Sequence, residues 1–180
     1  MFPSRRIINR KNFLFIVFAF VLFLAAFQYI FYLMREECGL STILDLYFHY
    51  SADEAYSLLN YYGPGGRDIY FWGLLLDAVF PAIYGLFLWM SITYLSERIH
   101  LSKSTVRFLQ SLPFIAVGFD YIENLLEMRM ILGYPQAVKS IAPICSWVTT
   151  FKWISIYSNI FVLVFLVLIF VFGMNTRTEK

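Results

Sequence analysis

The sequence predicts an all-α integral membrane protein, a four-helix bundle with a short amphipathic helix in the loop between its first two spans. Hydrophobic residues make up 60% of the chain, whereas soluble proteins average about 45–50%. Four apolar blocks each reach the ~20 residues that cross the hydrocarbon core of a bilayer. They lie at about 13–34, 69–95, 106–131 and 143–172. We therefore expect residues 1–180 to form a single membrane domain.

The first apolar block is predicted to be a retained membrane helix. Its apolar run is longer than the ~7–15 residues of a signal-peptide core, and no small-x-small cleavage site follows it. Block 13–34 therefore counts as the first span of the bundle.

The basic residues predict the orientation of the chain, because Lys and Arg are enriched on the cytoplasmic side of membrane proteins. Nine of them fall on one side, namely Arg5, Arg6, Arg10, Lys11, Arg98, Lys103, Arg107, Arg177 and Lys180. Five lie at or near the other side, namely Arg35, Arg67, Arg129, Lys139 and Lys152. We expect both termini to be cytoplasmic, with segments 35–67 and 132–142 outside. The pattern does not identify the membrane.

Segment 35–67 is predicted to contain the short amphipathic helix. Ser51 followed by Glu54 forms a capping-box pattern, and Gly63 with Pro64 gives a stop. The upstream stretch "STILDLYFHY" is compatible with a further helical turn or two. The segment either rests on the bundle and the membrane surface or acts as a lid over a binding site.

The stretch "GPGGR" at 63–67 is predicted to be the turn that starts the second span, with Asp68 as its N-cap. It resembles a phosphate-binding loop only in its glycines, because neither a strand nor a GK[ST] sequence accompanies it.

The cysteine pattern and the net charge exclude two classes of function. No CxxC pair is present, which argues against a thiol-disulfide oxidoreductase. Cys38 and Cys145 fall near the same ends of helices 1 and 4, so they either form a disulfide or remain two buried thiols, the commoner arrangement. A net charge of +2 with no basic run beyond the N-terminus argues against a nucleic-acid partner.

Polar residues in all four spans are predicted to form one layer in the outer half of the bundle. At ~1.5 Å per residue, Asp77 lies ~12 Å deep, Asp120 ~15 Å and Glu123 ~10 Å. Gln28 on helix 1 and Lys152 on helix 4 reach similar depths of ~10 Å and ~14 Å. Charged residues in hydrocarbon face protein or water, so these side chains are expected to point inward.

The helical faces support the same layer. Asp120, Glu123, Asn124 and Glu127 are spaced as one stripe, and Asp77 with Tyr84, and Thr149 with Lys152, lie on matching stripes. Pro81 has no N–H and leaves the carbonyl of Asp77 free to accept another hydrogen bond. Glu127 and Arg129 are placed near the interface, where they can reach water, and are left outside the layer.

The layer holds three carboxylates and one cation, Lys152. A net charge of about −2 in a low-dielectric interior is unfavourable. We expect a carboxyl to be protonated, a water-filled vestibule to solvate the group, or a cation to enter. Alternatively, these polar residues serve only to hold the helices together.

The favoured function is the binding of a small amphipathic or cationic ligand. Its candidate residues are Asp77, Tyr84, Asp120, Glu123, Asn124, Lys152, Gln28 and Thr149. Tyr84, Tyr121 or Trp72 are available as aromatic walls for a cation. The expected partners are the lipid bilayer, a lipid or amine-bearing molecule, and a second copy or another membrane protein. The sequence identifies no cofactor.

Two other functions stay open. The first is a membrane enzyme that uses Asp120, Glu123, Asp77 or Lys152 for acid and base chemistry on a lipid-soluble substrate. A hydrolase is disfavoured because Ser155, Thr149 and Thr150 are expected to have no nearby His. No DxxxD cluster is present, so no metal is expected. The second is a structural subunit or scaffold of a membrane complex.

Overall fold

The structure is a computed structural model that describes residues 9–40, 42–136 and 140–178, with side chains described as far as residue 172. The described residues form helices and no strands. These are α2 (Arg10–Cys38), the 3-10 turn η1 (Leu44–Leu46), α3 (Ala52–Tyr61), α4 (Gly63–Asp77), α5 (Phe80–Arg98), α6 (Lys103–Gly133) and α7 (Ile141–Thr178). Among the basic residues used to predict orientation, Arg5, Arg6, Lys139 and Lys180 lie outside the described residues.

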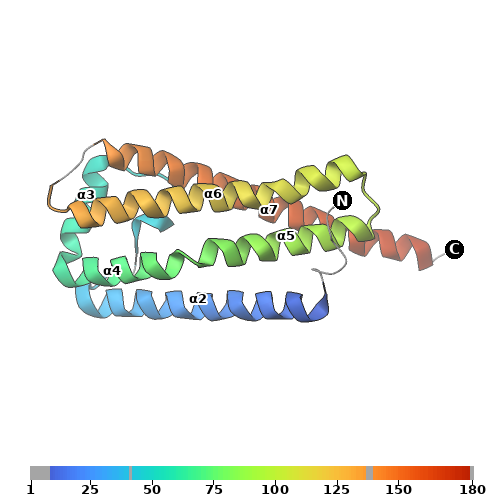
Figure 1. Ribbon diagram of the computed structural model, residues 1–180, viewed down its shortest axis with the longest axis horizontal. Helices are drawn as coiled ribbons and strands as arrows, with labels where there is room; N and C mark the ends of the chain where they lie inside the picture. Colours follow the sequence, from blue (N-terminus) through green and yellow to red (C-terminus); the bar gives the residue numbers. More distant parts are fainter. Residues whose placement is uncertain (1–8, 41, 137–139, 179–180) are drawn as a thin grey trace.

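The long helices run side by side along the long axis of the molecule (Figure 1). α4 and α5 follow each other along one line, with α2 on one side and with α6 and α7 on the other. α6 packs against α5 and α7, and α2 packs against α4 and α5. The short helix α3 lies at the end where α4 begins and α6 finishes, called the α3 end below.

Three helical stretches are long and apolar enough to cross a membrane, namely Arg10–Cys38, Gly63–Arg98 and Ile141–Phe172. The predicted blocks 13–34, 69–95 and 143–172 fall within them. α6 covers the block predicted at 106–131 and has 31 residues. It is not among the three, because the charged and amide residues of its inward face lower its hydropathy. Large apolar side chains are exposed on the outward faces, such as Phe18, Trp72, Leu125 and Phe161.

The second apolar block differs from the single helix that was predicted. α4 begins at Gly63, with Pro64 in its first turn, so "GPGGR" is helical and Asp68 is not the N-cap. Proline fits this position because the first helical N–H groups have no partner within the helix. The helix is then interrupted at Ala78 and Val79, before α5 begins at Phe80. Pro81 explains the break, since it cannot donate to the carbonyl of residue 77.

The capping box predicted before α3 is confirmed. The Glu54 N–H donates to Ser51 Oγ at 3.2 Å, and the Ser51 N–H donates to the Glu54 carboxylate at 2.7 Å. The hydrogen bonds from Ser51 lower the pKa of Glu54. Ala55 and Leu59 on the inward face of α3 are fully buried. Gly63 has φ of +65°, a left-handed conformation that lets the chain reverse into α4.

The two cysteines are unpaired in the structure. The Cys38 thiol donates to the Met34 carbonyl at 3.0 Å within α2. Cys145 is fully buried in α7. Both belong to the hydrophobic core at the α3 end, so the unpaired alternative is the one observed.

The contact between α5 and α6 depends on a glycine. A Cβ atom added at Gly85 would lie 2.5 Å from Val117 Cγ2, whereas a Cβ added at Gly118 would have nothing within 4 Å. Valine is stiff about χ1 in a helix and cannot easily move aside. The absence of a side chain at Gly85 therefore sets the close approach of the two helices.

We expect Gly85→Ala to lower the free energy of unfolding by ~1–3 kcal/mol, because overpacking forces side chains or backbone to shift. The matched control is Gly118→Ala, which adds the same methyl group to open space in a helix and is expected to be neutral or stabilising. Thermal unfolding of the purified protein in one detergent compares the two. Equal melting temperatures for both variants would contradict the close contact.

Candidate functional site

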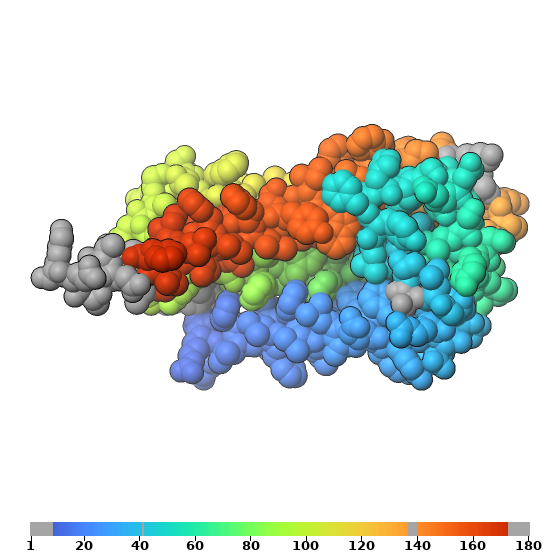
Figure 2. All heavy atoms as spheres, turned by 180° about the vertical axis from the view of Figure 1, so that it is seen from behind, coloured from blue at the N-terminus to red at the C-terminus, as the bar shows by residue number. Residues whose placement is uncertain are grey.

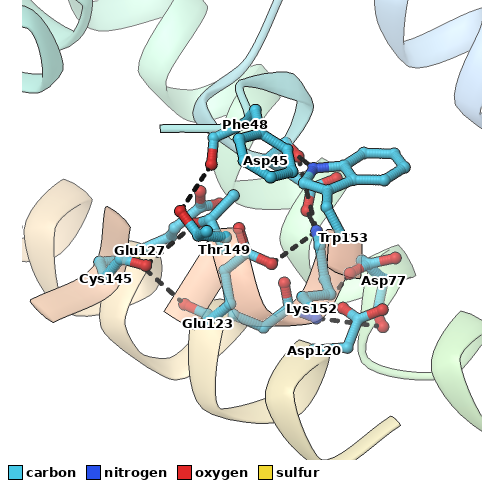
Figure 3. A network of polar contacts seen from close by, with 12 residues as sticks. Asp45, Phe48, Asp77, Asp120, Glu123, Glu127, Cys145, Thr149, Lys152 and Trp153 are labelled. Carbon is cyan, nitrogen blue, oxygen red and sulfur yellow. Dashed lines mark hydrogen bonds and ion pairs between the residues drawn. The ribbon is translucent and has the colours of Figure 1, made fainter. Parts of the chain in front are cut away.

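Most of the polar residues predicted from the sequence meet in one cluster (Figure 3). Asp77 comes from the last turn of α4, and Lys152 from α7. α6 supplies a stripe of four buried residues, Asp120, Glu123, Asn124 and Glu127. The spacing of i, i+3, i+4 and i+7 puts the whole stripe on the face that α6 turns toward its neighbours. These side chains are buried between the helices, as predicted for all of them except Glu127.

The ammonium group of Lys152 lies between two carboxylates (Figure 3). It forms an ion pair with Glu123 Oε2 at 2.5 Å and a second ion pair with Asp45. The indole N–H of Trp153 donates to the backbone carbonyl of Asp45 at 3.0 Å. The two neighbouring residues of α7 therefore hold η1 against the helices.

Asp77 is held at the interruption between α4 and α5. Asn124 Nδ2 lies 2.5 Å from Asp77 Oδ2 and 3.5 Å from the Asp77 carbonyl oxygen. This carbonyl is the one that Pro81 leaves free, so the predicted open acceptor is present and is taken by a side chain of α6. The same amide thus binds both the carboxylate and the backbone of residue 77.

Two tyrosines donate to the remaining carboxylates. Tyr84 OH donates to Asp120 Oδ2 at 2.8 Å. Tyr70 OH donates to Glu127 Oε2 at 2.5 Å, and both of these side chains are almost fully buried. The expectation that Glu127 reaches water is wrong, because its side chain is fully buried and α3 with the segment before it packs against this end of the helices. Arg129, placed with Glu127, is exposed.

The buried carboxylates outnumber the buried cations. Asp77, Asp120, Glu123 and Glu127 are buried and Asp45 is half-buried, whereas Lys152 is the buried cation in the described part of the chain. Burying a charge is costly unless it is paired and hydrogen-bonded. Several buried oxygens of the cluster accept no hydrogen bond from the described residues. They include Asp120 Oδ1, Glu123 Oε1, Asn124 Oδ1 and Glu127 Oε1. The cluster can therefore accept further hydrogen bonds or bind a cation.

Three of the carboxylates converge closely enough to share a cation. One oxygen each from Asp45, Asp120 and Glu123 lies within 4.8 Å of the others. Carboxylate oxygens are the preferred ligands of hard cations such as Ca²⁺ and Mg²⁺. The expectation that no metal is bound rested on a missing DxxxD pattern, but Asp45 comes from η1 and is distant in sequence from Asp120 and Glu123 of α6.

The space beside this cluster is small. A cavity of about 10 Å³ is lined by Asp45, Tyr70 and Asp77 together with apolar residues of α2 and α4. This is about the room that one water molecule needs. This cavity accommodates a water or a small ion but not an amphipathic molecule.

Three predicted residues lie apart from the cluster. Gln28 is exposed on α2 and lines a surface cavity of about 340 Å³ with Tyr32 and Arg35. The face of α2 that contacts α4 carries Ile30, which meets Gly73. Of the suggested aromatic walls, Tyr84 points inward, but Trp72 is 65% exposed and Tyr121 is 37% exposed. Thr149 is buried near the cluster and donates to the Cys145 carbonyl at 3.0 Å.

The segment before α3 supplies contacts that sequence reasoning missed. His49 Nδ1 lies 3.0 Å from Ser146 Oγ and 3.2 Å from Thr150 Oγ1. The statement that Thr150 has no nearby His is therefore wrong in space. The Tyr50 N–H donates to Ser146 Oγ at 2.8 Å, and Thr150 Oγ1 donates to the Phe48 carbonyl at 2.8 Å. These bonds fasten the segment to α7.

Two buried tyrosines lie on either side of α3 in the sequence, Tyr50 before it and Tyr62 at its C-cap. Tyr50 is 3% exposed, and burial raises the pKa of its hydroxyl far above the usual value. Burial likewise raises the pKa of Tyr62, whose hydroxyl donates to the Thr42 carbonyl at 2.8 Å. Both hydroxyls are therefore neutral, and neither donates to a carboxylate: Tyr62 binds a backbone carbonyl, and the Tyr50 hydroxyl has no partner among the described residues.

Comparison with known proteins places the chain in no group. No protein-family model matches the sequence, and no curated protein or solved structure shows significant similarity to it.

Proposed function

We propose that the chain is a four-span membrane bundle, with both termini in the cytoplasm and the acidic cluster in the outer half of the bilayer. α6 is the span that needs argument. Its charged stripe is buried against α4, α5 and α7, whereas its outward residues include Ile122, Leu125 and Leu132, which are 48%, 70% and 65% exposed. A helix with one buried charged face and one exposed apolar face is suited to contact protein on the first face and lipid on the second.

We infer that the function of this bundle is to bind a small cation. The observation that carries this proposal is the convergence of Asp45, Asp120 and Glu123, of which Asp120 and Glu123 each retain a buried oxygen without a hydrogen-bond partner. A chain that needed these groups only for packing would leave fewer acceptors unused, because unpaired buried polar groups are destabilising. A bound cation would use the spare acceptors and offset the excess negative charge.

Lys152 indicates which ligands the cluster suits. Its ammonium group already lies against Asp45 and Glu123, so the oxygens can surround a primary ammonium. A metal ion or a small protonated amine would bind beside Lys152 at Asp120 or would displace it. An amphipathic amine would require more room than the cavity of about 10 Å³, so η1 would have to move away for it to bind.

η1 is the natural gate for this ligand. The side chain of Asp45 is 22% exposed, whereas Glu123 is fully buried and Lys152 is 3% exposed in its side chain. Asp45 is thus the member of the cluster nearest to solvent. A cation arriving from the α3 end would meet Asp45 first and would exchange with its bond to Lys152.

The test uses Asp120→Asn, because asparagine can still accept the hydrogen bond from Tyr84 but carries no charge. Melting temperatures are measured in one detergent with Ca²⁺, Mg²⁺ or methylammonium as probes. We expect at least one probe to raise the melting temperature of the wild type, since a ligand that binds only the folded state stabilises it. We expect Asp120→Asn to lose this response while its melting temperature without probe is unchanged or higher.

The matched control is Asp53→Asn, which removes an exposed carboxylate of α3 and should keep the response. Each of the three probes is tested on the wild type separately, and the probe that raises the melting temperature distinguishes a metal site from an amine site. The proposal fails if no probe shifts the wild type, or if both variants keep the same shift. A large loss of stability in Asp120→Asn without probe would instead mean that the carboxylate serves packing.

A further inference from the structure

A second site lies at the end of the molecule opposite to the acidic cluster. A groove of about 600 Å³ runs between the first turns of α2 and the later part of α7, with α5 as its floor. Its lining includes Arg10, Phe13, Tyr94, Leu95, Leu163 and Val167. In the space-filling view, α5 is visible in green in the gap between α2 and α7 (Figure 2).

The groove is apolar along most of its length. Phe13 comes from α2, Leu95 from α5, and Leu163 with Val167 from α7, so three helices contribute apolar side chains to it. Its volume falls within the ~300–1,000 Å³ that is usual for ligand sites in proteins. An extended hydrocarbon chain is the type of group that such a surface accepts.

One end of the groove is basic. Arg10 lines the groove where α2 begins. Arg98, in the last turn of α5, lies with its guanidinium 5.1 Å from the ring centre of Tyr94, which is also a lining residue. Guanidinium groups bind phosphate oxygens through paired hydrogen bonds. The groove therefore combines a long apolar surface with two arginines, one at the start of α2 and one at the end of α5.

We propose that this groove binds one anionic phospholipid. Its phosphate contacts Arg10 and Arg98, and one acyl chain lies along Phe13, Leu163 and Val167. Basic pockets between membrane helices at the water interface attract anionic head groups. The proposal requires only that the start of α2 and the end of α5 lie at a membrane surface. It is independent of cation binding at the acidic cluster.

The experiment is native mass spectrometry of the full chain after exchange into vesicles with equal amounts of phosphatidylglycerol and phosphatidylcholine. We expect one retained phosphatidylglycerol per chain, with a preference of roughly tenfold, which two arginines near a membrane surface can supply. The double variant Arg10→Gln and Arg98→Gln is expected to retain the two lipids equally. The control Arg129→Gln, an exposed arginine of α6 at the α3 end, should keep the preference.

A second variant tests the apolar part separately. Val167→Trp fills the groove from a side chain that is 41% exposed, so it does not enlarge a packed core. We expect it to lose the retained lipid while its melting temperature stays close to that of the wild type. Three results would each overturn the proposal. The wild type could retain both lipids equally, the arginine variants could keep the preference, or a dimer could exclude lipid from the groove.

Discussion

Lys152→Met is expected to lower the free energy of unfolding by ~3–5 kcal/mol, the usual cost of removing one partner from a buried ion pair. Lys152 is 2% exposed and contacts both Asp45 and Glu123, so its loss leaves two carboxylates without their cation. Methionine keeps most of the side-chain length, which limits the loss of packing. The measurement is thermal or denaturant unfolding in a single detergent.

Two further variants separate charge from packing. Lys103→Met removes an exposed lysine at the start of α6 and should change stability little. The double variant Lys152→Met with Glu123→Gln should recover part of the loss, because the unpaired charge at residue 123 is then gone. If the double variant is as unstable as the sum of the two single variants, the pairing of Lys152 with Glu123 does not matter for stability.

Tyr70→Phe is expected to have the next largest effect, a loss of ~1.5–3 kcal/mol, which is typical of a hydrogen bond to a charged buried group. The Tyr70 hydroxyl is the donor to Glu127 Oε2, while Glu127 Oε1 has no partner among the described residues. Without Tyr70, a fully buried carboxyl would lose its hydrogen bond. Thermal unfolding again measures the change.

The control for this change is Tyr61→Phe, which removes the hydroxyl of a tyrosine that is 60% exposed and should be nearly neutral. Combining Tyr70→Phe with Glu127→Gln asks whether the effect depends on the carboxyl group. If Tyr70→Phe were as harmless as Tyr61→Phe, the interpretation of Glu127 as a buried group held by Tyr70 would have to be abandoned.

The helical content and the α6 stripe could be predicted because both follow from periodicity. Asp120, Glu123 and Asn124 repeat at helical spacing, so they share a face wherever that helix lies. Asp77 and Lys152 could be matched to them by depth and by helical face, since each lies at a fixed rise and rotation along its own helix. These five residues do meet in the structure, around the ammonium group of Lys152 and the amide of Asn124.

Other parts of the site depend on how a non-helical segment folds. Asp45 and His49 lie in a stretch with no long periodic pattern, so nothing in the sequence indicates that they contact α7. The burial of Glu127 is a consequence of the same segment covering the helix ends. Gln28 was misplaced for a different reason, because an almost uniformly apolar helix gives no sign of which face turns inward.

If the chain is the four-span bundle proposed above, the pairing of Lys152 has a consequence for the order in which its helices enter the membrane. The carboxylates of Asp77, Glu123 and Glu127 are synthesised before the lysine that compensates them, because Lys152 follows all three in the sequence. In the proposed four-span bundle, α4 and α6 would therefore enter the bilayer with these acids neutral or still in contact with water. Synthesis of α7 then supplies both the ammonium group and the surface on which η1 docks, so the acidic site is completed last.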